Sequence, residues 1–250
     1  MDKDSHEAKL EREQQWYAEP GFRADHPLNS RLLYSRERNA FNYREARRRL
    51  GALLGPAGDL LIAPVGRGTD LPYLKPLASR IAGIDVAAEA VAGIDDPDVG
   101  AVVGDMLALP YEDESFDAVA VSLFFHHYVN QGYDPYLREL RRVLRPGGVL
   151  VTLEPSALHP TWWLSWTLRQ VVGNVSGTVA DERPIRASQL AKAMRRAGFA
   201  DVHVEAAAFP HPRTPVPLAR AINRAAPAFV RIPVVKHLAW TFVARARKPG

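Results

Sequence analysis

Apolar and polar residues alternate in blocks between residues 59 and 154, and these blocks predict strands separated by helices. Residues 60–63 form an apolar run without a polar interruption, and 118–123 and 149–154 are largely apolar. Short runs of this kind are typical of parallel strands covered on both faces. Residues 135–144 carry Leu and Val at helical spacing before a Pro-Gly-Gly stop. We therefore predict an α/β fold with a doubly wound sheet and ligands at the carboxyl ends of its strands.

The chain outside this block is less regular. Helical patterns cover residues 7–17, 35–50 and 188–196, and strand patterns cover 202–208 and 237–246. Residues 217–226 predict a short amphipathic helix ended by Pro227.

Two units are expected from this division. Residues 1–50 form an N-terminal helical segment that covers the active site. Residues 51–250 form the main domain, with substrate-side insertions at about 155–185 and 209–235.

Composition narrows the class of protein. Apolar residues make up 47% of the 250 positions and charged residues 24%, as in a soluble globular protein. The chain has no Cys, its N-terminus is charged throughout, and its longest apolar run is too short to cross a bilayer. We expect a cytoplasmic protein with no transmembrane segment and no metal site.

Charge is distributed unevenly along the chain. Residues 51–182 carry 8 basic and 17 acidic residues, whereas 183–250 carry 13 basic and 2 acidic residues. Such a split can mark a face that binds nucleic acid or a membrane. It can also arise from solvated Arg residues on helix surfaces, and this second interpretation is favoured. Nucleic acid is the weakest candidate because the Trp cluster lies mostly outside the basic segment. A peripheral membrane contact stays open.

The stretch 59–85 carries the strongest candidate for a binding site. Gly66 and Gly68 lack Cβ atoms, so the backbone after the first strand can bend tightly and a ligand can approach it. Asp85 follows Gly66 by 19 residues, which is the spacing of a carboxylate that binds ribose hydroxyls in dinucleotide-binding folds. The alternative is an ordinary strand–helix–strand crossover in which Asp85 caps a strand.

Five motifs in order extend this pattern: Gly66-x-Gly68-Thr69, Gly83-Ile84-Asp85, Gly104-Asp105-Met106, LPYEDESFDAV and RELRRVLRPGGVL. Together they resemble class I S-adenosylmethionine-dependent methyltransferases, in the small-molecule branch with the ubiquinone and menaquinone methyltransferases. The resemblance implies a mostly parallel seven-stranded Rossmann-like sheet with helices on both faces and an antiparallel last strand. It also implies S-adenosyl-L-methionine as cofactor.

The resemblance carries cofactor-binding roles to particular positions. Gly66 and Gly68 would approach the methionine end, Asp85 the ribose and Asp105 the adenine amino group. The complete expected set is Gly66, Gly68, Asp70, Asp85, Val86, Asp105, Met106 and Ser122. Two positions depart from the family, because Pro64 replaces an acid and Asp70 replaces a third glycine. Asp70 either binds the cofactor's ammonium group or caps the following helix.

Candidate catalytic residues follow the fourth strand. His126 and His127 could remove a proton from the acceptor, and the resemblance slightly favours His127. The alternative is that one caps the following segment and the other packs in the core. Two adjacent His residues without a third ligand do not make a metal site. Glu154, at the end of the fifth strand, either faces the acceptor or anchors a loop.

Aromatic residues outside the strands suggest the acceptor. Phe124, Trp162, Trp163, Trp166 and Phe209 are the expected substrate-binding residues, unless they only pack the lid against the core. We predict a methyltransferase that acts on an O, N or C atom of a small, apolar or ring-bearing acceptor, as a monomer or homodimer. The alternative is a cyclase or isomerase of the same fold that binds the cofactor without transferring methyl.

Overall fold

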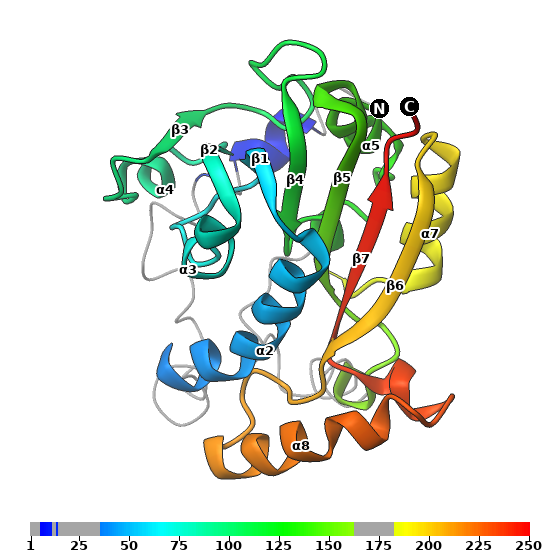
Figure 1. Cartoon of the computed structure of the whole chain (residues 1–250). Helices are drawn as coiled ribbons and strands as arrows, with labels where there is room; N and C mark the ends of the chain where they lie inside the picture. Colours follow the sequence, from blue (N-terminus) through cyan, green and yellow to red (C-terminus); the bar gives the residue numbers. More distant parts are fainter. Residues whose placement is uncertain (1–5, 12–13, 15–35, 163–182) are drawn as a thin grey trace.

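The computed structural model describes residues 6–11, 14, 36–162 and 183–250, and its centre is a seven-stranded sheet (Figure 1). The strand order is β3-β2-β1-β4-β5-β7-β6. β1 to β5 pair in parallel, and β7 is antiparallel to both of its neighbours. The strands are β1 (Ala57–Ile62), β2 (Ala78–Asp85), β3 (Val99–Val103), β4 (Phe116–Ser122), β5 (Leu144–Pro155), β6 (Ala200–Ala208) and β7 (Thr241–Arg247). The predicted fold class, including the antiparallel last strand, is confirmed.

Helices pack on both faces of the sheet because successive strand residues point to opposite sides. On one face, Leu60 and Ile62 of β1 join a core cluster with Leu50 of α2. On the other face, Leu61 joins a cluster with Leu137 of α5. The helices are α2 (Arg36–Leu54), α3 (Leu71–Leu74), α4 (Ala88–Ala92), α5 (Asp134–Val143), α7 (Ala187–Arg196) and α8 (Val216–Phe229), with 3-10 turns η1 (Lys75–Leu77), η2 (Phe125–His127) and η3 (Val235–Leu238).

Several element boundaries differ from those predicted. α8 does not end at Pro227 but continues to Phe229, because a proline near the end of a helix removes only one backbone donor. β7 starts at Thr241, and His237 belongs to η3 instead. α2 runs to Leu54, across the division expected after residue 50. Its buried residues therefore belong to the core of the main domain.

α2 also holds the turn that follows β1. Arg47 donates from Nε to Asp70 Oδ1 at 2.6 Å and from Nη2 to Thr69 Oγ1 at 3.2 Å. The Arg47 and Asp70 side chains are only 12% and 9% exposed, so this ion pair is largely removed from water. Asp70 precedes α3 but makes no side-chain capping bond, so the capping interpretation is wrong. Its carboxylate neutralises Arg47 instead.

We predict that Asp70→Asn lowers the free energy of unfolding by about 3 kcal/mol, because it leaves the nearly buried Arg47 charge without a negatively charged partner. Urea denaturation measures this loss. The double variant Arg47→Gln/Asp70→Asn recovers part of it, and Arg48→Gln, on the exposed side of the same helix, changes stability by less than about 0.5 kcal/mol. Equal stability of the Asp70→Asn variant and the wild type contradicts this role.

Candidate active site

The glycine turn after β1 has the backbone conformation that its sequence predicts. Gly66 and Gly68 have φ values of 53° and 70°, in the left-handed region that favours glycine. A Cβ atom on Gly68 would also lie 2.8 Å from the side chain of Leu71. Both glycines are therefore required by the shape of the turn, whether or not a ligand is bound.

Asp85 joins this turn to the end of β2. Its Oδ2 accepts a hydrogen bond from Gly66 N at 2.8 Å, and its Oδ1 accepts one from Ala87 N at 3.0 Å. The side chain is almost fully buried. A carboxylate has about four acceptor positions, so Asp85 can anchor the turn and still accept ribose hydroxyls.

The next strand end presents Asp105 and Met106. Asp105 accepts from Leu107 N at 2.9 Å, and its other oxygen lies 2.7 Å from Nε2 of His6. Gln14 donates to the carbonyl of Val86 at 3.2 Å. The N-terminal residues therefore contact two of the strand ends where the adenosyl group is expected. His6 and Gln14 had no recognisable signal in the sequence, because both contacts join residues more than 70 positions apart.

Ser122 ends β4, which pairs with β1, the strand that leads into the glycine turn. Its Oγ is buried and has no hydrogen-bond partner in the described parts of the chain. A buried hydroxyl without a partner is costly, and a polar ligand at the strand ends would satisfy it. Together with the glycine turn and the two carboxylates, Ser122 fits a bound S-adenosylmethionine.

Glu154, at the end of β5, holds the turn after β4 in place. Its Oε1 accepts from Phe124 N at 2.9 Å and from Phe125 N at 2.8 Å. Its Oε2 accepts from His126 N at 3.3 Å and lies 2.9 Å from His126 Nδ1. The carboxylate is completely buried, and these bonds replace the water it has lost. Of the two roles considered for Glu154, the loop anchor is confirmed.

The pairing with Glu154 distinguishes the two histidines. A carboxylate only accepts hydrogen bonds, so in this pair Nδ1–H of His126 donates to Glu154 Oε2 and Nε2 is left as the acceptor atom of the ring. The His127 ring packs beside that of His126, with 4.2 Å between ring centroids, and its backbone N–H donates to Phe124 at 3.0 Å. The Glu154 carboxylate therefore orients the ring of His126 through Nδ1.

The aromatic residues expected at the substrate side fall into separate groups. Phe124 is buried in the core against Tyr128 and Tyr136, at centroid distances of 4.7 Å and 5.1 Å. Phe209 contacts Phe229 of α8 at 5.3 Å. Trp162 stacks on Trp240 at 5.3 Å with an angle of 9°. Trp163 and Trp166 lie outside the described residues.

Two histidines complete the group around Trp240. His159 and His211 lie edge-on to the Trp240 ring, at 5.3 Å and 4.3 Å. Burial lowers the pKa of His211 to about 4, helped by His159 and by Arg213, and burial also lowers the pKa of His159. Both rings are therefore neutral at neutral pH. Trp240 and these histidines were missed because they lie far apart in the sequence.

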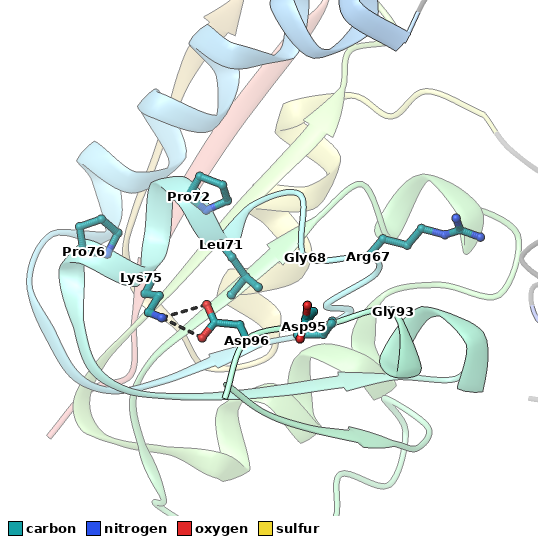
Figure 2. A pocket seen from close by; sticks show the side chains of 10 residues that line it. Arg67, Gly68, Leu71, Pro72, Lys75, Pro76, Gly93, Asp95 and Asp96 are labelled. Atoms are coloured by element: carbon teal, nitrogen blue, oxygen red, sulfur yellow. Dashed lines mark hydrogen bonds and ion pairs between the residues drawn. The ribbon is translucent and has the colours of Figure 1, made fainter. Parts of the chain in front are cut away.

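A pocket of about 630 Å³ opens on the outer side of the glycine turn. It is lined by Arg67, Gly68, Leu71, Pro72, Lys75, Pro76, Gly93, Ile94, Asp95 and Asp96. Figure 2 shows Lys75 directed at Asp96, with Nζ–Oδ1 at 2.8 Å, and Arg67 extended away from this pair. The pocket shares Gly68 with the strand-end site but does not include Asp85 or Asp105.

The described residues contain no group of three or more His, Asp or Glu side chains that could hold a metal ion. No helix among them is long and apolar enough to span a membrane.

Comparisons with known proteins agree with this geometry. The family "Methyltransferase domain" matches residues 63–152. A demethylmenaquinone methyltransferase from Mycobacterium marinum is 30% identical over 164 residues, which cover 60% of this chain and 70% of that protein. A solved S-adenosylmethionine-dependent methyltransferase from Thermotoga maritima, a possible histamine N-methyltransferase, has the same fold, with a TM-score of 0.64, 20% identity, and coverage of 85% and 92% of the two chains. The solved [4+2]-cyclase SpnF also shares the fold, with a TM-score of 0.51, 22% identity, and coverage of 81% and 80%.

The fold, the ordered strand-end residues and these relatives define a class I S-adenosylmethionine-dependent methyltransferase. Within that class, the chain belongs to the branch that contains the menaquinone methyltransferases. It is an enzyme that uses S-adenosylmethionine to methylate a small molecule.

We predict that Asp85→Asn weakens binding of S-adenosylmethionine roughly 10–100-fold, because a charged acceptor of the ribose hydroxyls becomes neutral. Isothermal titration calorimetry measures the affinity, and thermal unfolding shows that the variant remains folded. Asp95→Asn, in the exposed loop after α4, is the matched control and retains wild-type affinity. Unchanged affinity in folded Asp85→Asn protein rejects the ribose-binding role.

Proposed function

We propose that the acceptor is an apolar, ring-bearing small molecule with an ionisable hydroxyl, and that His126 removes its proton. The observation that carries this proposal is the 2.9 Å contact between His126 Nδ1 and the buried Glu154 carboxylate, beside the end of β4. The curated relatives are named for demethylmenaquinone, a quinone-type substrate, which supports a ring acceptor. The aromatic residues Trp162, Trp240 and Phe209 suit such a molecule.

S-adenosylmethionine supplies an electrophilic methyl group on its sulfonium when it is bound. In the proposed complex, Asp85 and Asp105 hold its ribose and adenine, and the glycine turn adjoins its amino-acid end. Asp70 is the weakest member of the expected cofactor set, because its carboxylate is already paired with Arg47. Val86, Met106 and Ser122 would form the remaining walls of the cofactor-binding site.

The protein's own contribution to the reaction is orientation and proton removal. His126 would take the acceptor's hydroxyl proton on Nε2 while Nδ1–H continues to donate to Glu154. The negative charge of Glu154 would then stabilise the imidazolium, and the oxyanion left on the ring would make it a better nucleophile. This assignment differs from the slight preference for His127 that the family resemblance gave.

Methyl transfer to the proposed acceptor class can be tested directly. Wild-type protein is incubated with methyl-labelled S-adenosylmethionine and a reduced, short-chain demethylated naphthoquinone, with a pool of hydrophilic amines as the comparison. Label that enters the organic extract as a single methylated ring product supports the proposal. Label that enters only the amine pool contradicts it, and so does cofactor binding without transfer to either pool.

We predict that His126→Gln lowers kcat roughly 100- to 10,000-fold, with cofactor affinity within a few-fold of wild type. The pH profile separates proton removal from packing, because the variant loses the rise in rate that accompanies deprotonation of the base. His127→Gln, on the adjacent residue of the same turn, is the matched control and keeps kcat within a few-fold. The opposite result, with the large loss of kcat in His127→Gln, assigns the base to His127. Near-wild-type turnover in both variants means that neither histidine is the base and that the enzyme only positions the acceptor and the cofactor.

A further inference from the structure

Exposed apolar side chains are concentrated in one segment of the described structure, between β6 and β7. Residues 209–240 are called the β6–β7 arm, and they contain α8 and η3. The large apolar residues of the arm with high exposure are Leu218, Val230, Ile232, Val234 and Leu238. Val234 is 71% exposed, more than any other large apolar side chain in the described parts. Clusters of this kind mark interaction surfaces.

The same arm is strongly basic. It contains Arg213, Arg220, Arg224, Arg231 and Lys236, and the sequence has no Asp or Glu after Glu205. Arg231 and Lys236 are exposed and lie between the exposed apolar residues in the sequence VRIPVVKHL. No carboxylate of the described residues forms an ion pair with either of these two side chains. Apolar and cationic groups are therefore presented together.

The arm ends beside the carboxyl end of β5, the strand that carries Glu154. Thr241, directly after the arm, pairs with Pro155, and Phe242 pairs with Glu154. Ser156 N donates to Trp240 O at 2.8 Å, which fixes the end of the arm next to β5. Figure 1 shows α8 along the lower margin of the molecule, below the ends of β6 and β7. A surface bound to the arm would lie close to the strand end that holds His126.

The start of the arm is also fixed firmly to the main domain. The amide nitrogen of Asn42, on α2, donates to the carbonyls of His211, Pro212 and Thr214, each at 3.0 Å. The ring of Phe209 contacts Phe229. These contacts hold the start of the arm and α8 against the main domain. The exposed apolar residues that follow are therefore carried by an anchored segment.

We propose that the β6–β7 arm docks on the surface of an anionic lipid bilayer. Exposed aliphatic side chains can enter the boundary between headgroups and acyl chains, and Lys and Arg beside them attract anionic headgroups. A second copy of the chain fits less well, because it would bring two acid-free basic arms together. Nucleic acid fits less well because the exposed side chains are aliphatic, whereas single-stranded bases stack on aromatic rings.

Docking brings the active-site edge to the bilayer, where apolar ring compounds dissolve. The docking itself does not depend on the identity of the acceptor. Its use, the uptake of an apolar acceptor directly from the lipid phase, rests on the proposed function.

Vesicle flotation without cofactor or acceptor tests the docking. Full-length protein is mixed with phosphatidylcholine vesicles or with vesicles of equal parts phosphatidylcholine and phosphatidylglycerol, at low and moderate salt. We predict that wild type floats with the anionic vesicles and that Val230→Ser/Ile232→Ser/Val234→Ser lowers the partition coefficient at least tenfold. Arg231→Gln/Lys236→Gln lowers it several-fold, and only on anionic vesicles.

Two matched controls separate docking from general effects. Val102→Ser/Val103→Ser changes exposed apolar residues on the edge strand β3, and Lys192→Gln/Arg195→Gln changes exposed charges on α7. Both controls are predicted to float like wild type, with circular dichroism showing that all variants are folded. The proposal is overturned if wild type does not float, or if the controls lose as much binding as the arm variants.

Other occupants would give different results. A wild-type dimer in sedimentation velocity that the triple Ser variant converts to monomer assigns the arm to self-association and overturns the proposal. Salt-sensitive RNA binding without flotation also overturns it. Because no donor or acceptor is present, a failure here leaves the methyl-transfer assay unaffected, and a failure of that assay leaves the flotation result unaffected.

Discussion

The proposed chemistry depends on the hydrogen bonds that the buried carboxylate of Glu154 forms with the turn after β4. The carboxylate accepts three backbone N–H groups from this turn and contacts the ring of His126. A buried charge without these partners would be strongly unfavourable, so the turn and the carboxylate stabilise each other. The parallel pairing of Ser122 with Leu153 brings the two strand ends together. The same bonds that satisfy Glu154 therefore hold His126 at the edge of the sheet where ligands bind in this class of fold.

In the expected cofactor-binding site, a single carboxylate likewise stabilises the fold and is available to the ligand. Asp85 fixes the glycine turn through Gly66 N and ends β2. Arg47 of α2 holds the other side of this turn through Asp70. A turn supported from both sides is already shaped before a ligand arrives, which reduces the ordering cost of binding. The family's usual acid is replaced here by Pro64, and the Arg47–Asp70 pair is the polar support that the described turn contains instead.

The sequence predicted the order of strands and helices because each is encoded locally, by apolar runs and helical spacing. The glycine turn, Asp85, Asp105, Ser122 and both histidines could be proposed as site residues from the sequence, because they lie at or shortly after strand ends and match the motifs of the family; their roles stay predictions. The sequence offered no reason to prefer His126 over His127, because the contact that favours His126 is made by Glu154, 28 residues further along the chain. The contacts of His6 with Asp105 and of Arg47 with Asp70 were invisible for the same reason. The length of α8 was misjudged because Pro227 was taken as a stop, although a proline close to a helix end is tolerated.

The tautomer of the His126 ring tests the central claim most directly. Long-range ¹H–¹⁵N correlation spectra of the histidine rings report which nitrogen carries the proton in the neutral form, and His126→Gln assigns the signal. Pairing with an ionised Glu154 predicts a proton on Nδ1 and an unprotonated Nε2, a preference that Glu154→Gln weakens. A proton on Nε2 in the wild-type protein would contradict the account, because His126 could then not accept the acceptor's proton at that atom.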